Sequence, residues 1–450
     1  MRQCRRLMPF INDDRQDTPM DAGSITWIGA LVGLALAIGL ILKKFNPVYS
    51  LFLGAIIGSF VGGATPVEVI KILTAGDQSV IGTVLRVLAA GVLAGVMMET
   101  GAAETMATAI VEKLGEKRAL LALALASMVI CSVGVFIPVT VLIVAPIALD
   151  IGARTGISKL SLLVAVSGGA KAGNIISPNP NTIAAAAGFK LELSQVMMAG
   201  YIPALFGLVM AVVLATMVKT RGTMVRPEDL ADQVHKGHGG PTLRAAVVAP
   251  AVAIVLLMLN PLGALTGIHA LQQIKLDALF ILPLAGIIGL AAMKKLGHVA
   301  EYVTAGLNRM TPTALILLGA GGIGGMISAS SLPHEIVRII QGAGISGTLL
   351  APISGILMAS ATASTATGVI LATGSFAQPI LAMGTTPLAA AVMMHTGATV
   401  IDAMPHGNYF HASADAMKMD MGERMKLIPY EAAVGGVMCL VATVLYGFIL

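Results

Sequence analysis

Charged residues are scarce in this chain of 450 residues. Only 11% of them are Asp, Glu, Lys or Arg, whereas 56% are hydrophobic. In a soluble domain, roughly a quarter of all residues are charged. The domain needs these residues because its surface faces water. The low charge therefore leaves little room for a soluble globular fold.

Cysteine is also rare, and motifs of enzyme active sites are lacking. The three cysteines, Cys4, Cys131 and Cys439, have neither the spacing of a metal site nor that of a disulfide framework. We find no P-loop, no nucleophile elbow and no metalloprotease motif. The glycine run from Gly319 to Gly325 has no strand before it, so close helix packing explains it better than phosphate binding. We therefore expect no metal, no cofactor and no enzymatic activity.

The first 24 residues lack the apolar centre and the small-residue cleavage site of a secretory signal. They are polar and mixed in charge, and we interpret them as a tail before the first membrane span. The net charge of +5 comes mostly from loops and termini. It fits topology signalling and lipid contact better than nucleic-acid binding.

Long apolar stretches are what the chain has in place of charge. Stretches of about twenty residues recur along most of its length, as expected of helices that cross a bilayer. They are too long and too continuous for the alternating strands of a membrane barrel. The sequence thus predicts an all-α integral membrane protein, a polytopic helical bundle with about ten to twelve passes. The expected early spans are 27–42, 48–61, 79–98, 119–151, 160–187, 196–218, 243–259 and 276–293.

The second half of the chain repeats the organisation of the first. In each half, a glycine-rich span and a more polar helix precede an apolar segment interrupted at its middle. A helix broken by a proline and asparagine motif then follows. The matching segments are 89–98 and 318–327, 131–138 and 360–368, and 177–182 and 404–409. Interrupted segments at matching positions of two halves indicate the central site of a transporter.

This repeat predicts the domain organisation. The predicted parts are a tail (1–24), N-terminal membrane spans (25–77), a first transport repeat (78–220), a polar linker (221–240), connecting spans (241–310) and a second transport repeat (311–450).

The physics of the breaks predicts where a substrate binds. Pro178 and Pro180 have no N–H to donate, and each disfavours helix in the residue before it. A broken helix survives at membrane depth only where its freed backbone groups face protein, water or ligand. Helix N-termini at a break attract a carboxylate, and nearby neutral side chains add hydrogen bonds. The candidate substrate-binding residues are Ser132, Asn174, Ser177, Asn179, Asn181, Thr182, Thr362, Ser364, Thr365, Thr367, His406 and Asn408.

Two charged residues lie in apolar surroundings next to the breaks. Lys171, a further substrate-binding candidate, could hold a substrate carboxylate, pair with an acid or reach the membrane interface. Asp402 is a candidate for proton or cation coupling, or for the partner of Lys171. His395 is the second coupling candidate, because histidine titrates near physiological pH.

Three regions resemble the gluconate permease family of the ion transporter superfamily. They are the broken-helix motif Pro178-Asn-Pro-Asn-Thr182, the Ser/Thr/Ala-rich stretch 361–369, and the C-terminal motifs at 406–410 and 421–426. The resemblance implies proton-coupled uptake of sugar acids and related hydroxycarboxylates through the inner membrane. It also implies two inverted repeats, each with a re-entrant hairpin and a broken helix. A homodimer and an elevator-type movement of transport domains against scaffold domains are further implications.

The chain departs from the family pattern at two places. Pro138 stands where the family carries an acid in its first hairpin, and an Asn-Asp pair of the family is not reproduced at 406–408. A citrate or dicarboxylate substrate, and Na+ in place of the proton, therefore stay open.

We expect a secondary active transporter for a small organic anion, working in the lipid bilayer. A cation/proton antiporter of the same superfamily is one alternative, and it would depend heavily on Asp402. An integral-membrane enzyme would need a cluster of polar catalytic residues, which the sequence does not offer. A channel is disfavoured because paired broken helices suit alternating access.

Overall fold

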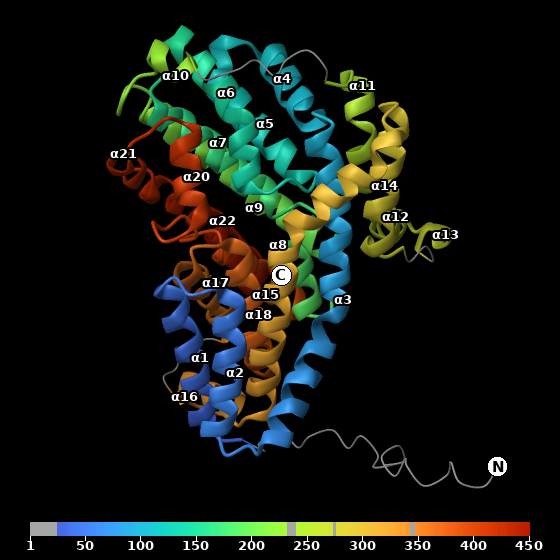
Figure 1. The fold of residues 1–450 in the computed structure, drawn as a ribbon, viewed down its shortest axis with the longest axis vertical. Helices are drawn as coiled ribbons and strands as arrows, with labels where there is room; N and C mark the ends of the chain where they lie inside the picture. The colour runs from blue at the N-terminus through green and yellow to red at the C-terminus, as the bar shows by residue number, and fades with distance from the viewer. Residues whose placement is uncertain (1–24, 232–239, 273–275, 343–346) are drawn as a thin grey trace, which may run out of the picture.

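The computed structural model describes residues 25–231, 240–272, 276–342 and 347–450, and this part of the chain is almost entirely helical (Figure 1). The predicted tail and positions 232–239 of the predicted linker lie outside the described residues. Six helices are long and apolar enough to cross a membrane, and five shorter apolar helices accompany them. The expected all-α membrane fold is confirmed.

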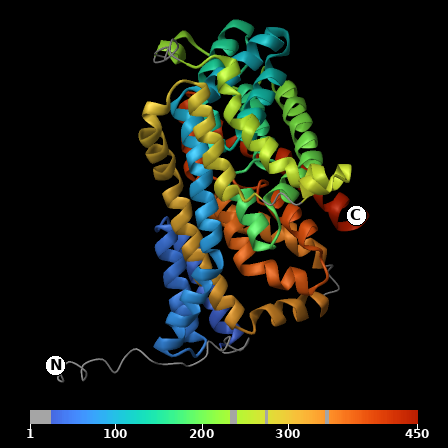
Figure 2. The same ribbon diagram turned by 90° about the vertical axis from the view of Figure 1, so that its right-hand side faces the viewer.

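Two long helices, α3 (Pro66–Glu99) and α15 (Val299–Ala329), run side by side through the molecule (Figure 1, Figure 2). A Cβ added to Gly76 would lie 2.1 Å from the carbonyl oxygen of Gly321. One added to Gly306 would lie 2.1 Å from that of Gly91. The start of each helix thus meets the end of the other, so the two are antiparallel. Glycine is required here because any side chain would separate the backbones.

Each long helix carries a helical hairpin on one end. The hairpin of α1 (Trp27–Leu42) and α2 (Pro47–Val61) packs against α15 in the lower half of Figure 1. The hairpin of α12 (Val248–Thr266) and α14 (Ala278–Ala292) packs near α3 in the upper half. An ion pair of 2.6 Å between Arg86 of α3 and Asp277, the N-cap of α14, links the hairpin of α12 and α14 to α3.

Two further hairpins end near the middle of the molecule. The first joins α5 (Ala119–Ser132) to α6 (Ile137–Thr155) through the first tip, residues 133–136. The second joins α17 (Leu350–Thr362) to α18 (Thr365–Ala382) through the second tip, Ala363 and Ser364. They approach from opposite ends, α5 and α6 from above and α17 and α18 from below (Figure 1). These are the re-entrant hairpins expected from the sequence.

Two helices are interrupted beside the hairpins. The first break, residues 175–179, separates α7 (Lys159–Asn174) from α8 (Pro180–Gly188). The second break, residues 398–407, separates α19 (Pro387–Gly397) from α20 (Asn408–Ala416). The other helices are α4 (Ala102–Leu114), α9 (Leu193–Met217), α10 (Pro227–Ala231), α11 (Leu243–Ala246), α13 (His269–Gln272), α16 (Leu332–Gly342), α21 (Met421–Met425) and α22 (Ile428–Val444), with a π-helical end at Leu445–Ile449.

Helix boundaries differ from the sequence prediction where caps decide them. The third helix begins at Pro66, well before residue 79, because Thr65 and Glu68 form a capping box. The interruption expected near Pro138 lies just before it, since proline fits the first turn of α6 at no cost in hydrogen bonds. α3 and α15 begin upstream of positions 78 and 311, and the division into transport repeats stays a prediction.

The described part of the linker forms hydrogen bonds with Lys159 of α7 and with Glu423 of α21. Lys159 of α7 donates a hydrogen bond of 2.8 Å to Asp229, and Glu423 accepts bonds from the N–H and hydroxyl of Thr223. Burial raises the pKa of Asp229, but the hydrogen bonds from Lys159 and the N–H of Arg226 lower it more. The net pKa of Asp229 lies below its usual value, so the carboxylate stays charged at neutral pH.

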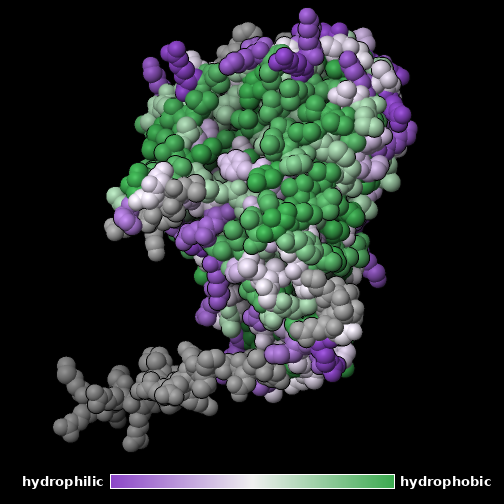
Figure 3. Space-filling model, turned by 180° about the vertical axis from the view of Figure 1, so that it is seen from behind, coloured by the Kyte–Doolittle hydropathy of each residue, from purple (hydrophilic) through white to green (hydrophobic). Residues whose placement is uncertain are grey.

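The surface has the polarity that a bilayer requires. Figure 3 shows a broad hydrophobic region bounded by hydrophilic residues towards both ends. Large hydrophobic side chains are exposed along one face of α9. They are Tyr201, Ile202, Leu205, Phe206, Val209 and Val213. Such an exposed apolar stripe fits lipid contact.

Candidate functional site

A candidate site is a pocket of about 750 Å³ that is lined by residues of both hairpin tips. Residues of α15, of the turn between α1 and α2, of the second break and on both flanks of the first break also line it. The lining thus combines one long helix and the α1–α2 turn with the hairpins and the broken helices.

Most of the predicted binding residues line this pocket. They are Asn174, Asn181, Thr362, Ser364, Thr365, Thr367, Asp402, His406 and Asn408. The remaining predicted residues are not among the lining residues, and they are Ser132, Lys171, Ser177, Asn179, Thr182 and His395. Ser132 donates to the carbonyl of Val129 in its own helix. His395 is buried in α19 away from the pocket.

Three asparagines hold the first break together. Asn179 is the N-cap of α8, and its Oδ1 accepts from the backbone N–H of Asn181 and of Thr182. Its Nδ2 donates to Asn174 Oδ1 at 2.7 Å, and Asn181 Nδ2 donates to the same oxygen at 2.9 Å. Asn179 and Thr182 thus shape the break, whereas Asn174 and Asn181 also reach the pocket. Ser177 is fully buried within the break.

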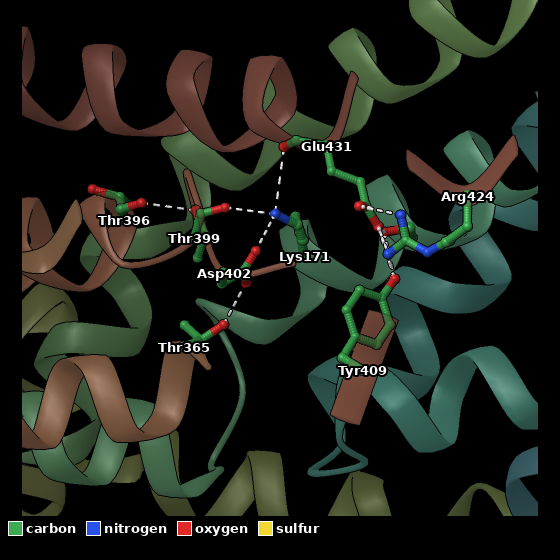
Figure 4. A network of polar contacts seen from close by, with 9 residues as sticks. Lys171, Thr365, Thr396, Thr399, Asp402, Tyr409, Arg424 and Glu431 are labelled. Carbon is green, nitrogen blue, oxygen red and sulfur yellow. Dashed lines mark hydrogen bonds and ion pairs between the residues drawn. The ribbon is translucent and has the colours of Figure 1, made fainter. Parts of the chain in front are cut away.

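A buried ion pair holds the second break (Figure 4). Lys171 Nζ donates to Asp402 Oδ1 at 2.5 Å, to the carbonyl oxygen of Thr399 at 2.6 Å and to that of Glu431 at 3.4 Å. The other oxygen of Asp402 accepts from the hydroxyl of Thr365 at 2.5 Å. Of the roles considered for Lys171, the structure shows the ion pair with Asp402. Its three acceptors use all the donors of an ammonium group.

A second buried ion pair was not predicted. Both nitrogens of the Arg424 guanidinium fork contact Glu431, at 2.9 and 3.2 Å. Glu431 Oε1 also accepts from Ser167 and from Tyr409, whose ring lies 5.4 Å from the Arg424 guanidinium carbon (Figure 4). Arg424 was interpreted as part of a loop motif, whereas Glu431 stands directly before a long apolar run, which is a usable signal in the sequence. This pair fixes α20, α21, α22 and α7 to one another.

The pocket favours an anion. Among the described lining residues, Asp402 is the one carboxylate, and Lys171 neutralises it. Lys44, Arg309, His406 and His411 line the pocket as basic groups, with Arg309 also paired to Glu99 at 2.7 Å. The N-terminus of α20 begins there at Gly407 without a side-chain cap. Its free N–H groups and partial positive charge suit a carboxylate.

The described residues contain no cluster of three or more His, Cys, Asp or Glu side chains that could hold a metal ion. The donors that line the pocket are amides, hydroxyls, imidazoles, backbone N–H groups, the Lys44 ammonium and the Arg309 guanidinium. This set can bind and orient a small organic molecule by hydrogen bonds.

The fold is shared with a solved transporter. The YdaH transporter of Alcanivorax borkumensis, described as having an unusual topology, superposes with a TM-score of 0.56 over 85% of this chain and 88% of that one. The two sequences are only 13% identical, so this likeness concerns the fold alone.

Sequence comparison gives the family. An uncharacterised transporter of Haemophilus influenzae is 47% identical over 94% of this chain and 99% of its own length. The L-idonate transporter of the Gnt-II system of Escherichia coli is 23% identical over 76% of this chain and 82% of its own length. The family profile described as GntP family permease matches residues 25–449. The chain therefore belongs to the GntP family of permeases, and it is a multi-pass transporter of the bacterial inner membrane rather than an enzyme.

Proposed function

We propose that this permease is a secondary active transporter that carries a small organic anion together with protons. The observation that supports this most directly is the pocket between the hairpin tips. It combines a paired and thus neutralised carboxylate, basic side chains and the uncapped N-terminus of α20. These features favour a carboxylate group over a cation.

The substrate we propose is a gluconate-like sugar acid or another hydroxycarboxylate. The related proteins support this class, because they include an L-idonate transporter of Escherichia coli and a gluconate permease of Zymomonas mobilis. The latter is 26% identical over 40% of each chain. The hydroxyls of Thr362, Ser364 and Thr367 add neutral polar groups to the wall.

Asp402 is the proposed site of proton coupling. It borders the pocket and is bonded to Thr365 beside the second hairpin tip. A proton on Asp402 would weaken its attraction to Lys171, which holds the second break. Protonation and movement of the second tip are thereby linked in one hydrogen-bonded unit. His395 is set apart from the pocket, which makes it the weaker coupling candidate.

The movement we propose is an elevator-type displacement of the hairpins and broken helices along α3 and α15. The lining of the pocket supports this division, because some of its residues belong to α15 and the α1–α2 turn. The others belong to the two hairpins and to the broken helices. A substrate in the pocket would thus be held between a fixed part and a moving part.

The test is uptake of labelled gluconate by proteoliposomes with and without an inward proton gradient. Unlabelled sugar acids, citrate, dicarboxylates and D-serine serve as competitors, since D-serine transporters are also relatives. We expect gradient-driven uptake in the wild type. In Asp402→Asn we expect its loss with retained exchange of substrate. Asp150→Asn, an exposed acid of α6, is the matched control.

Other outcomes would replace parts of the proposal. Uptake that follows a sodium gradient and ignores a proton gradient would make the transporter sodium-coupled. Competition by citrate or dicarboxylates alone would change the substrate class. If no competitor binds and added sodium dissipates a proton gradient, the protein is a cation/proton antiporter.

A further inference from the structure

The first break leaves one hydrogen-bond donor and one acceptor unused at the pocket. Among the described residues, Asn174 Nδ2 and Asn181 Oδ1 have no partner. Their side chains are deeply buried, with only 1% and 4% of each residue exposed, and both residues line the pocket. A buried polar atom without a partner is costly, so a native site that keeps two of them is prepared for a ligand.

The orientation of both amides follows from the start of α8. Backbone N–H groups can only donate, so Asn179 must present its oxygen to them and its Nδ2 to Asn174. Asn174 must then present its oxygen to Asn179, and Asn181 must donate to that same oxygen. The amino group of Asn174 and the oxygen of Asn181 are therefore the atoms that remain. Rotating any one amide would set donor against donor or acceptor against acceptor.

We infer that Asn174 and Asn181 together recognise a hydroxyl group of the transported anion. A hydroxyl accepts a bond through its oxygen and donates one through its hydrogen, so it satisfies both free atoms. A carboxylate only accepts and would leave Asn181 Oδ1 unpaired. An ammonium only donates and would leave Asn174 Nδ2 unpaired.

This assignment rests on the proposed function and refines it. The carboxylate of the substrate is placed by the N-terminus of α20 and the basic residues of the pocket. The two asparagines of the first break then select for a hydroxylated carbon elsewhere on the same molecule. The first break and the N-terminus of α20 thus bind two different groups of one substrate.

The experiment compares ligands that differ by hydroxyl groups. The pairs are gluconate and hexanoate, malate and succinate, lactate and propionate, and D-serine and D-alanine. Binding of each is measured by competition with the labelled anion that proteoliposomes take up. We expect the wild type to prefer the hydroxylated member of the transported pair by about tenfold or more, because a site built for a hydroxyl rejects the analogue without it.

In Asn181→Ala we expect this preference to fall to about threefold or less, with little change in the affinity for the member without hydroxyls. Gln378→Ala removes an exposed amide of α18 and serves as the control, with the preference unchanged. Size-exclusion profiles and thermal unfolding of both variants establish that they fold.

The outcomes separate the inference from the function on which it rests. If the wild type binds both members of the transported pair equally, the assignment of the asparagines is wrong and the transporter stands. An unchanged preference in a folded Asn181→Ala protein would also overturn it. If no pair binds at all, the proposed function itself fails. The wild-type ligand series decides the question even if the variant does not fold.

Discussion

Four charged side chains meet inside the bundle as two ion pairs, and the two pairs differ in their surroundings. Asp402 borders the pocket, and among the described residues its side-chain donors are Lys171 and Thr365. Glu431 accepts from Arg424, Ser167 and Tyr409. Glu431 thus has more side-chain donors than Asp402 and does not line the pocket. This difference supports the proposed coupling role of Asp402 and a structural role for Glu431.

Removing one partner of the first pair should destabilise the protein strongly. Lys171→Met leaves the Asp402 carboxylate buried without its cation, which costs about 3–5 kcal/mol. The double variant Lys171→Met/Asp402→Leu should recover much of this loss, because no unpaired charge is left. Thermal unfolding in detergent measures both. A Lys171→Met protein as stable as the wild type would contradict the pairing.

The second pair allows a graded comparison. Tyr409→Phe removes one of several donors to Glu431 and should cost about 1 kcal/mol. Arg424→Gln removes the cation and should cost about 3–5 kcal/mol. Chemical unfolding of both variants in the same detergent gives the two values. Equal losses would mean that Arg424 acts through ring packing rather than through its charge.

Residue types could be predicted more readily than partners. Asn174, Asn181 and Asp402 were identified from the sequence because they flank prolines and apolar runs. Glu431 and Arg424 were not, because the contact to Ser167 joins residues of different repeats. Nothing in the local sequence indicates such a long-range partner.

At the scale of elements, the second hairpin tip is pressed against the second break. A Cβ on Gly407 would lie 2.6 Å from both the Cβ and the carbonyl oxygen of Ala363. Ala363 itself has a left-handed backbone with φ of 47°. Thr365, two residues on, is bonded to Asp402. The tip is therefore held by close packing and by a hydrogen bond to Asp402, the proposed coupling residue.

Gly407→Ala should push this tip away from the break. We expect gradient-driven uptake to fall by about tenfold or more, because the added methyl group forces backbone shifts. Gly436→Ala, on α22, places its methyl group in open space and should leave uptake unchanged. Uptake by both variants at equal protein density is the measurement. Wild-type uptake in Gly407→Ala would show that the contact is dispensable.

Elements were predicted well where composition alone decides them. The first helix, Trp27–Leu42, matches the expected span. Both breaks overlap the predicted proline and asparagine motifs, although each begins some residues before its motif. The start of α3 was missed by more than three turns, because residues 66–78 include Glu68, Lys71 and Asp77. These charged residues make the segment less hydrophobic, so the predicted span did not include the start of the helix at the capping box.

At the scale of the whole molecule, the proposed movement can be arrested chemically. Phe45 of the α1–α2 turn and Ser364 of the second tip both line the pocket, and they belong to parts that the proposed movement displaces relative to one another. Phe45→Cys and Ser364→Cys, in a chain without Cys4, Cys131 and Cys439, can be joined by a short bifunctional thiol reagent. We expect cross-linking to stop uptake.

Each single-cysteine protein treated with the same reagent is the control and should retain its uptake. Full uptake by the cross-linked double variant would exclude an elevator-type displacement between these two parts. It would leave the pocket and its substrate class untouched.

The balance of buried charges has a consequence for the membrane potential. Among the described residues, the buried charged side chains are three cations, Lys159, Lys171 and Arg424, and three carboxylates, Asp402, Glu423 and Glu431. All six belong to the broken helices or their neighbours. Moving one net charge across 100 mV involves about 2.3 kcal/mol. In the proposed movement, the buried charges of the displaced helices cancel, so they add no electrical work when the empty transporter returns. The sum of these charges also stays zero when one monovalent anion is carried with one proton. The voltage across the inner membrane would then drive transport only if a second proton accompanies each monovalent substrate.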